Sequence, residues 1–312
     1  MPYCVSAPGH AIFRALQREV DTLSGKLDQA MPEIALCICT RNRAASLTRC
    51  LEHVASLKTD SPWELVVVDN GSTDDTPAAL EAFGARLPQL RVVHEPTPGL
   101  GRARNSGWRA TSAPVVAFTD DDCYVEPDYL DRMLAVFSED SGLGFVGGRI
   151  ELWDPSDAKV TIAPWTSPKA FPARSFIAAG SFHGANMAFR RTALEATGGF
   201  DPRFGSGTPF ACEDIDAAAG VLWADYRGAY DPRPVVHHHH GRKHVEVRKL
   251  GADYDRGRGA YYMKQLLSPG RRWAYGKAWA RSVAGSVIRR RPGKSIREFS
   301  SGMRFLVDHL RR

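Results

Sequence analysis

The sequence predicts an α/β fold in which a mostly parallel sheet is flanked by helices. Three apolar runs support this prediction, IALCICT, ELVVVD and VVAFT, since near-continuous apolar runs are typical of strands that are covered on both faces. Helical patterns separate the runs, and strands that alternate with helices favour parallel pairing. With 312 residues, 43% of them hydrophobic, the chain can bury a sizeable core in one large or two modest domains.

The predicted elements follow one another regularly as far as residue 150. We expect strands at 34–40, 64–69, 91–95, 115–119 and 145–150, and helices at 45–57, up to about Phe83, at 101–110 and at 127–138. A stretch rich in Pro, Ser and Trp, 151–182, then shows no period. Beyond it we expect a short strand in GANMAFRR that runs into a helix at 192–197, a helix from about Glu213, and a strand through DPRPVVHHHH.

The two ends of the chain differ from this middle part. Residues 1–30 are predicted to contain an amphipathic helix that packs on the body or on another subunit, and residues 246–312 to form basic helices. From Gly241 onwards there are 19 Lys and Arg against 5 Asp and Glu, a net +14, whereas the preceding part carries −8. Such a split indicates an acidic body and a basic tail with an anionic partner, either a membrane, a nucleic acid or an acidic substrate.

Within the basic tail, cationic side chains alternate with apolar ones. Ile296, Phe299, Met303, Leu306 and Leu310 repeat at 3-4-3-4 spacing in the last predicted helix. This pattern is typical of a helix at a membrane interface, and equally of an ordinary packing helix with a solvated face. Charge alone would also allow nucleic-acid binding, but no known motif supports it, so we expect no nucleic-acid partner.

Cysteine usage and hydropathy indicate the compartment. The six cysteines form no CxxC pair and no regular spacing, which is typical of reduced thiols in a cytosolic protein. No apolar run reaches the roughly 18 residues of a membrane span, and the N-terminus lacks a secretory signal pattern. We therefore expect a cytoplasmic protein, peripheral on the inner face of the plasma membrane if the basic tail binds lipid.

Acidic residues end two of the predicted strands. Asp69 ends the second strand, and Asp120, Asp121 and Asp122 follow the fourth, so both acidic ends should open on the same crevice of a parallel sheet. Carboxylates suit Mg2+ or Mn2+, and strand alternation would point Asp120 and Asp122 together and Asp121 elsewhere. Taken alone, each could instead be a turn residue or a helix cap.

Four consecutive histidines, 237–240, continue a strand-like run near residue 240. They could be a surface run, but an imidazole that completes a metal shell is the favoured interpretation. Alternation along a strand would turn either His238 and His240 or His237 and His239 inward.

Two further segments carry candidate site residues. PGLGRARNSG reads GxGxxR where a dinucleotide fingerprint requires GxGxxG, so we exclude a dinucleotide cofactor, although Gly99 and Gly101 permit close backbone approach. Arg104 in this segment could meet a phosphate or simply solvate a helix. Glu213 and Asp214 open a predicted helix, where the helix dipole alone would favour acidic residues.

Taken together, these segments resemble the family 2 glycosyltransferases with the GT-A fold. The similarity runs in order through CTRNR, VVVDNGSTDDT, GLGRARNSG, FTDDD, GANMAFRRTALEATGGFDPRFG, the Glu213–Asp214 pair and VVHHHHGRK. It covers about residues 33–243. The resemblance implies a glycosyltransferase domain at 31–245, with a nucleotide half at 31–125 and an acceptor half at 126–245.

The resemblance also implies roles for single residues. Asp214 would be the general base, with Glu213 beside it, and Asp122, Asp120 and His238 would hold Mg2+ or Mn2+. The nucleotide-sugar would lie along eleven residues: Thr40, Arg41, Arg43, Asp69, Gly71, Ser72, Gly101, Arg104, Asn105, Asp120 and Asp121.

The implied activity is metal-dependent, inverting transfer of a sugar from a nucleotide-sugar, with a UDP-sugar favoured, to a hydroxyl of a saccharide or lipid-linked glycan in polysaccharide biosynthesis. Two alternatives stay open. A nucleotidyltransferase acting on sugar phosphates would need a glycine-rich, lysine-bearing phosphate loop after the first strand, where this chain has CTRNRAAS. A non-catalytic scaffold that binds membrane or glycan would not need Asp69, Asp122 and Asp214.

Overall fold

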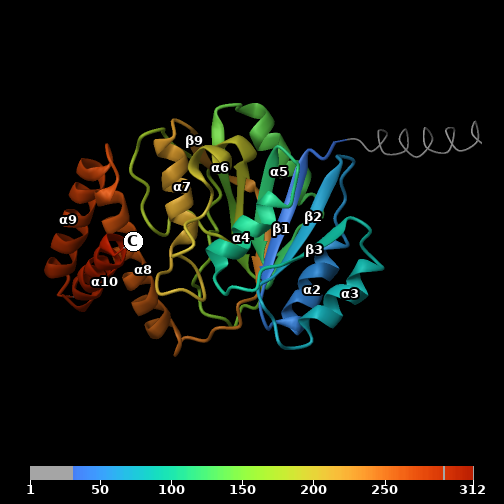
Figure 1. Ribbon diagram of the computed structural model, residues 1–312, viewed down its shortest axis with the longest axis horizontal. Helices are drawn as coiled ribbons and strands as arrows, with labels where there is room; N and C mark the ends of the chain where they lie inside the picture. Colours follow the sequence, from blue (N-terminus) through green and yellow to red (C-terminus); the bar gives the residue numbers. More distant parts are fainter. Residues whose placement is uncertain (1–30, 291, 312) are drawn as a thin grey trace, which may run out of the picture.

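The computed structural model describes residues 31–290 and 292–311 (Figure 1). The predicted N-terminal helix therefore lies outside the described residues. A single mixed sheet runs through the centre of the molecule with helices on its faces, so the predicted α/β architecture is confirmed.

The first half of the sheet is parallel. Its strands are β1 (Ile34–Thr40), β2 (Trp63–Asp69), β3 (Leu90–His94) and β4 (Val115–Asp120), in the spatial order β3-β2-β1-β4. The connecting helices are α2 (Ala44–Val54), α3 (Thr76–Gly84) and α4 (Leu100–Arg109). Each of these elements lies within two or three residues of its predicted position.

The second half of the sheet mixes both directions. Beyond β4 the order continues β8-β6-β9-β5, with β7 beside β9. The strands are β5 (Cys123–Val125), β6 (Leu143–Leu152), β7 (Lys169–Phe171), β8 (Asn186–Arg190) and β9 (Arg227–His238), and the helices are α5 (Tyr129–Glu139), α6 (Arg191–Thr197) and α7 (Glu213–Trp223). The three-residue strands β5 and β7 were not predicted, because a run of three residues carries too little periodicity to be recognised.

The strand order creates one crevice. After β1 the chain adds β2 and β3 on one side and then returns to place β4 on the other side of β1. At such a switch point the loops after the two central strands part, and a crevice opens at the carboxyl ends of the strands. Thr40 ends β1, Asp69 ends β2 and Asp120 ends β4, so the predicted acidic ends do meet at one edge of the sheet.

The strands are buried along almost their whole length. Ile34 to Ile38 of β1 and Leu65 to Val68 of β2 are fully buried. Burial of a side chain of this size contributes about 1.5–3 kcal/mol, so the central strands are held firmly by packing alone. The carboxyl ends that they carry are therefore fixed in position.

Three long helices follow the sheet. They are α8 (Val247–Leu267), α9 (Arg272–Ile288) and α10 (Pro292–Leu310), and they gather at one end of the molecule (Figure 1). Within the described residues, no helix is long and apolar enough to cross a membrane. The predicted apolar stripe of α10 includes Ile296, Phe299 and Leu310, and these side chains are exposed instead of packed.

Candidate active site

The three consecutive aspartates lie in the turn between β4 and β5, and their carboxylates have different partners. Asp121 is buried and accepts a hydrogen bond from Thr40 Oγ1 at 2.7 Å. Arg43 contacts Asp121 and Asp122: its Nε atom lies 3.3 Å from Asp121 and its Nη2 atom 2.7 Å from Asp122. The guanidinium of Arg43 thus neutralises part of the repulsion that three adjacent carboxylates would otherwise suffer.

Burial raises the pKa of Asp121 to about 7, although the neighbouring Arg43 and Thr40 act to lower it. Asp122 behaves differently. Burial alone would raise the pKa of Asp122, but His238 and Arg43 together hold it well below its usual range. Asp122 therefore stays ionised, as a metal ligand must be.

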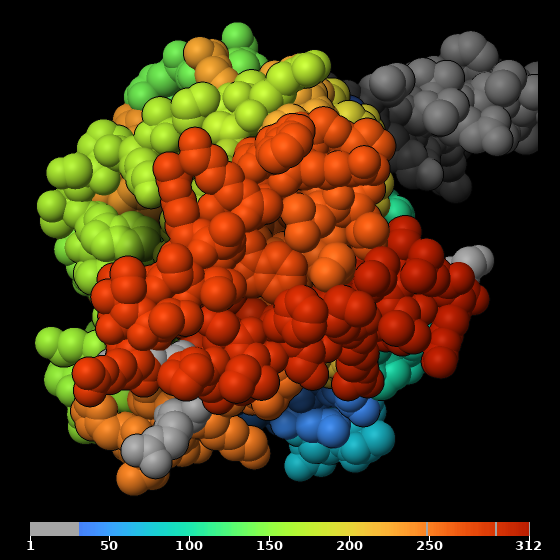
Figure 2. All heavy atoms as spheres, turned by 90° about the vertical axis from the view of Figure 1, so that its left-hand side faces the viewer, coloured from blue at the N-terminus to red at the C-terminus, as the bar shows by residue number. Residues whose placement is uncertain are grey.

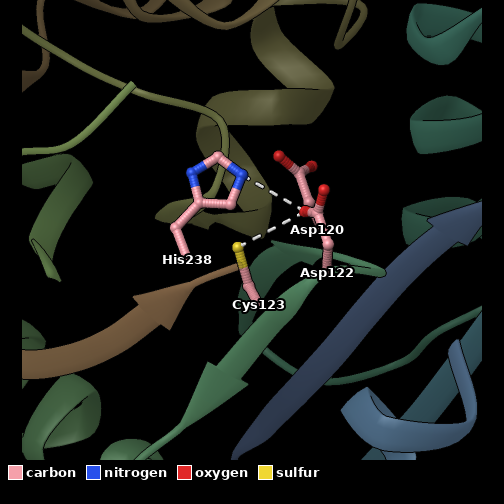
Figure 3. Close-up of side chains that lie close together, drawn as sticks. All are labelled: Asp120, Asp122, Cys123 and His238. Atoms are coloured by element: carbon pink, nitrogen blue, oxygen red, sulfur yellow. Dashed lines mark hydrogen bonds and ion pairs between the residues drawn. The ribbon is translucent and has the colours of Figure 1, made fainter. Parts of the chain in front are cut away.

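His238 is the histidine of the run that faces the aspartates (Figure 3). Its Nε2 atom lies 3.2 Å from Asp122 Oδ1, while its Nδ1 atom lies 3.1 Å from the backbone carbonyl oxygen of Thr161. A carbonyl oxygen only accepts, so Nδ1 carries a proton. Burial acts to lower the pKa of His238, but the contact with Asp122 raises it, so Nε2 donates to the carboxylate and would offer a lone pair only where a cation replaced that proton. Histidine metal ligands are commonly oriented in this way.

The other histidines have partners elsewhere. His237 Nε2 lies 2.6 Å from Glu126, and His239 Nδ1 lies 2.8 Å from the Tyr124 hydroxyl. His240 is buried beside Asp157, with Nε2 3.1 Å from the carbonyl oxygen of Ala158. The structure thus brings His238 to the aspartates and separates its three neighbours from them.

Asp120, Asp122, Cys123 and His238 form one group whose possible ligand atoms lie within 4.8 Å of one another (Figure 3). Two carboxylates and one imidazole are a donor set that suits Mn2+ or Mg2+. Cys123 is a soft ligand, and burial raises the pKa of its thiol well above the usual range. The thiol stays protonated, so the hard ligands fit a hard cation and Cys123 fills space beside them.

Arg104 connects this metal-binding group to the acidic pair Glu213–Asp214. Its Nη2 atom donates to Asp120 Oδ1 at 3.1 Å, and its Nη1 atom donates to Glu213 Oε1 at 2.6 Å. The side chain comes from α4 and is only 2% exposed. A buried guanidinium with two carboxylate partners fixes the distance between the metal-binding group and the start of α7.

Glu213 and Asp214 begin α7. The preceding residue, Cys212, has a left-handed backbone with φ 83°, which is unusual for a residue other than glycine and typical of functional sites. Asp214 is partly exposed, and its carboxylate accepts hydrogen bonds from the backbone nitrogens of Gly184 at 2.8 Å and Ile215 at 2.7 Å. Glu213 is buried against Arg104.

Surrounding protein raises the pKa of both acids. Burial raises the pKa of Glu213 to about 7, with Arg104 opposing the shift and Asp214 adding to it. Burial likewise raises the pKa of Asp214. A carboxylate whose pKa lies closer to neutrality is a stronger base than an ordinary one.

Hydrogen bonds to backbone nitrogens fix the loop after β2. Asp69 is buried and accepts from the backbone nitrogen of Ser72 at 2.8 Å, and Gly71 has φ 74°, which favours glycine. Ser72 Oγ accepts from the backbone nitrogen of Asn42, in the loop after β1, at 3.0 Å. The two loops after β1 and β2 are therefore tied to each other at the crevice.

Arg41 is exposed and makes no hydrogen bond or ion pair within the described residues. Two other predicted nucleotide residues have structural partners. The Asn105 side chain is fully engaged: it donates to the carbonyl oxygen of Phe200 at 2.7 Å and accepts from Phe200 N at 2.9 Å and Trp108 Nε1 at 3.0 Å. A Cβ at Gly101 would lie 2.8 Å from the backbone oxygens of Asp201 and Phe204. Both residues bind α4 to the 200–204 loop.

The structure adds residues that sequence reasoning missed. The Asn70 amide donates to the carbonyl oxygens of Glu95 and Thr97 and accepts from Gly99, so it fixes the loop before α4. His183 precedes Gly184, and burial lowers its pKa to about 4. The signal for Asn70 was its position after Asp69. For His183 no signal existed, because a single histidine in an aperiodic stretch is not distinctive.

Comparison with known proteins places this geometry in a family. The sequence profile described as Glycosyl transferase family 2 matches residues 35–198, just over half of the 312-residue chain. The chain belongs to glycosyl transferase family 2. This is a family of transferase enzymes, and its profile spans the crevice, the three aspartates and β8.

A curated relative and two solved structures support the assignment. The chain is 27% identical over 170 residues to a putative glycosyltransferase, EpsH, of Bacillus subtilis, covering 53% of this chain and 49% of the relative. It is similar in structure to the mannosyltransferase PcManGT of Pyrobaculum calidifontis, solved with GDP-Man and Mn2+ (TM-score 0.60, 19% identity, 96% of each chain). It is also similar to TarS 1-349 of S. aureus, solved with UDP-GlcNAc (TM-score 0.58, 17% identity, 78% and 69% covered).

These likenesses show that the family 2 transferase has the GT-A fold, a mixed α/β sheet flanked by helices, as the sequence predicted. The chain spans about half the length of the curated relatives that it matches.

Proposed function

We propose that this transferase moves a sugar from a nucleoside diphosphate sugar to a hydroxyl of a saccharide or lipid-linked glycan, with inversion at the anomeric carbon, in polysaccharide biosynthesis. The observation that carries the proposal is the position of Arg104 between Asp120 of the metal-binding group and Glu213 of the acidic pair. This single side chain holds a site for the leaving diphosphate next to a site for the attacking hydroxyl.

The donor would occupy the crevice at the ends of β1, β2 and β4. Asp69 and Ser72 belong to the loop that would border the base and ribose of the nucleotide. Thr40 and Arg43 would line the path toward its phosphates. A UDP-sugar is the favoured donor, and neighbours solved with UDP-GlcNAc and with GDP-Man support the nucleotide-sugar class. Because Gly101 and Asn105 already have backbone partners, we give them no donor contact.

Asp120, Asp122 and His238 would hold the cation, Mn2+ or Mg2+. The cation supplies positive charge that stabilises the departing diphosphate. The chain's own contribution is to keep Asp122 ionised through His238 and Arg43, and to keep His238 oriented through Thr161. Arg43 and Thr161 would not touch the bond that reacts, and their contacts fix the metal ligands before the donor binds.

Asp214 would be the general base. Glu213 is buried and bound to Arg104, whereas Asp214 is partly exposed and can meet an acceptor hydroxyl. Two backbone N–H groups hold the Asp214 carboxylate in one orientation. One base and direct attack give inversion, while a double displacement would require a second carboxylate as nucleophile.

The acceptor would bind beside Gly184, which contacts Asp214. The preceding residue, His183, lies near Trp165, with ring centroids 6.5 Å apart, and Trp165 is 45% exposed. Its indole also packs edge-on against Tyr230 at 5.3 Å. An exposed indole held by its neighbours offers an apolar face to the ring of a sugar, so we assign Trp165 to the acceptor side.

A lipid-linked acceptor lies at the surface of a membrane, and an enzyme that uses one has to work there. We therefore place the transferase at the inner face of the plasma membrane, as a peripheral protein. This part of the proposal depends on the basic C-terminal helices rather than on the crevice.

The comparisons with known proteins support neither alternative, the nucleotidyltransferase or the non-catalytic scaffold. A nucleotidyltransferase would need a glycine-rich phosphate loop after β1, where the chain has CTRNRAAS. A non-catalytic scaffold would have no use for a buried arginine between two acidic groups, which is costly to build.

The proposal is tested by calorimetric titration of UDP, GDP and dTDP into the full chain with and without Mn2+. We expect one nucleotide to bind in a manganese-dependent way, and Asp122→Asn to abolish that dependence. The matched control is Asp128→Asn, which removes an acid whose ion pair is with Arg132 on the surface of α5. If none of the three nucleotides binds with the metal, the transferase proposal is wrong.

A further inference from the structure

The two C-terminal helices α9 and α10 expose an unusual number of large apolar side chains. On α9, Trp273 is 91% exposed and Ile288 81% exposed. The full set on the two helices is Trp273, Val283, Val287, Ile288, Ile296, Phe299, Met303, Val307 and Leu310. Single exposed apolar residues are common on protein surfaces, but a concentration on two adjacent helices indicates a binding surface.

The packing of α10 explains why its apolar side faces outward. Glu298 and Gly302 of this helix are buried against α8, and Phe305 is buried against Phe204 and Phe210. Glu298 accepts hydrogen bonds from Arg258 Nε at 2.5 Å and Trp279 Nε1 at 3.2 Å. These residues fasten one side of the helix to the protein, so the apolar stripe on its opposite side is left for another partner.

Ile296, Phe299, Met303 and Leu310 follow one another along α10 at steps of three, four and seven residues, so they lie on one side of the helix. Figure 2 shows α8 to α10 spread over one face of the molecule, in orange and red. The exposed apolar side chains of α9 and α10 are therefore carried by neighbouring helices on one face of the molecule.

The same helices carry a large positive charge. From Arg271 to Arg311 the sequence has 11 Lys and Arg against 2 Asp and Glu. One of the two acids, Glu298, is buried and paired with Arg258. Arg272, Lys277, Arg289 and Arg304 are exposed, and Arg272, Trp273 and Lys277 line an open hollow on α9.

Charge decides between the partners that an apolar surface could have. A second copy of the chain, docked through the same face, would bring two strongly positive surfaces together. A nucleic acid would satisfy the charge but would leave the aliphatic side chains without an apolar partner. An anionic lipid surface satisfies both, because phosphate headgroups attract the cations and the acyl boundary accepts the apolar stripe.

We propose that α9 and α10 form an interfacial membrane-binding surface for anionic lipid. This surface is fixed to the acceptor half of the enzyme. A Cβ at Gly257 of α8 would lie 2.8 Å from the backbone oxygen of Ala211, which is one residue before Cys212 and three before Asp214. Lys264 of α8 also contacts Asp216 of α7 at 2.5 Å. The proposed function enters this inference at one point: a lipid-linked acceptor would give the enzyme a reason to bind a membrane.

Vesicle sedimentation tests the surface directly, without donor or metal. The full chain is mixed with vesicles of phosphatidylcholine alone or with about one third phosphatidylglycerol, at low and high salt. We expect binding to the anionic vesicles, weaker binding at high salt because ions screen the cations, and little binding to neutral vesicles. The double variant Ile296→Ser, Phe299→Ser should lower the partition coefficient at least about tenfold, since two apolar side chains no longer enter the lipid.

Val92→Ser is the matched control, because Val92 is an exposed apolar residue on β3 at the other end of the sheet. It should bind vesicles as the wild type does, and so should Asp214→Asn, which separates this inference from the catalytic one. Equal and weak binding to both vesicle types would overturn the inference. So would a dimer in sedimentation velocity that dissociates on Ile296→Ser, Phe299→Ser while vesicles remain unbound.

Discussion

The guanidinium of Arg104 donates a hydrogen bond of 2.6 Å to the carboxylate of Glu213. Arg104 also reaches Asp120 at 3.1 Å, and both contacts are made by a side chain that is 2% exposed. Through this contact the end of β4 and the start of α7, which lie about ninety residues apart in the sequence, are held at a fixed separation. The site is therefore one unit rather than two acidic clusters.

Replacing Arg104 should uncouple the two parts of the site. Arg104→Lys keeps a charge but cannot reach two carboxylates in a fork, so we expect kcat to fall about 100-fold while the nucleotide still binds. Arg104→Ala should in addition lower the free energy of unfolding by about 3 kcal/mol, because the buried Glu213 and the partly exposed Asp120 lose their partner. Steady-state kinetics and urea unfolding measure these effects. Arg109→Lys, at an exposed position on the same helix, is the control, and equal effects at both positions would contradict the assignment.

The activity should depend on pH through the acidic pair. Burial raises the pKa of Glu213 to about 7 and also raises the pKa of Asp214. A base acts only when it is ionised, so kcat/KM should rise with pH over a range above the ordinary carboxyl pKa of about 4 and then level off. A rate profile that is flat over this range, or whose acidic limb lies near the ordinary carboxyl pKa of about 4, would show that neither acid is the base.

The same pKa shifts should make the folded chain less stable as the pH rises, whereas the activity should increase. Both acids hold a proton more tightly in the folded chain than in the unfolded one. The contribution of Glu213 to the free energy of unfolding is therefore fully present below the unfolded pKa of about 4 and is lost as the pH rises through about 7, and the contribution of Asp214 changes in the same direction. Urea unfolding of the wild type and of Glu213→Gln at several pH values separates this contribution from that of other groups.

Of the four histidines, His238 should affect metal binding at the aspartates. His238→Gln removes the Nε2 atom that lies 3.2 Å from Asp122, and we expect manganese affinity to fall at least about tenfold. His237→Gln is the control, since His237 Nε2 lies 2.6 Å from Glu126 and His237 is not part of the metal-binding group. Electron paramagnetic resonance of free Mn2+ measures both affinities. Equal losses in the two variants would mean that the four histidines act together and that His238 alone is not the metal ligand.

Two tryptophans with the same exposure should differ in their effect on the acceptor. Trp165 and Trp153 are each 45% exposed, but Trp165 lies near His183, whereas Trp153 packs against His53, Tyr124 and His237. Trp165→Ala should raise KM for the saccharide acceptor and leave donor hydrolysis unchanged. Trp153→Ala should change neither, and a rise in KM for both variants would argue for a general loss of structure.

Much of the fold could be predicted because the strands are buried on both faces. Runs such as 34–40 and 115–120 have to be apolar throughout, and the strand ends then follow from the first polar residue. The acidic residues were placed at the crevice for the same reason, since Asp69 and Asp120 are the last residues of β2 and β4. Long, strongly patterned elements are read from local sequence with little ambiguity.

Contacts between distant segments could not be predicted in this way. Strand alternation was expected to point Asp120 and Asp122 together, and they do share a ligand group, but they do so through the turn between β4 and β5. The choice among four adjacent histidines depends on the pairing of β9 with β5, where Cys123 lies opposite His238. No local pattern encodes that register.

The last helix shows the limit of periodicity more clearly. Its 3-4-3-4 stripe was correctly read as one side of a helix, but the pattern does not say whether that side faces the protein or a partner. The answer depends on Glu298, whose partners Arg258 and Trp279 belong to two other helices.

The most direct test of the catalytic account uses Asp214→Asn. Transfer and nucleotide binding are measured on the same preparation, with Mn2+ and with the donor identified by the nucleotide titration. We predict that Asp214→Asn binds the nucleotide with the affinity of the wild type while transfer falls about 100- to 10,000-fold, because the acceptor hydroxyl has lost its base. Transfer near the wild-type rate would contradict the assignment of Asp214 and, with it, the proposed arrangement of metal and base around Arg104.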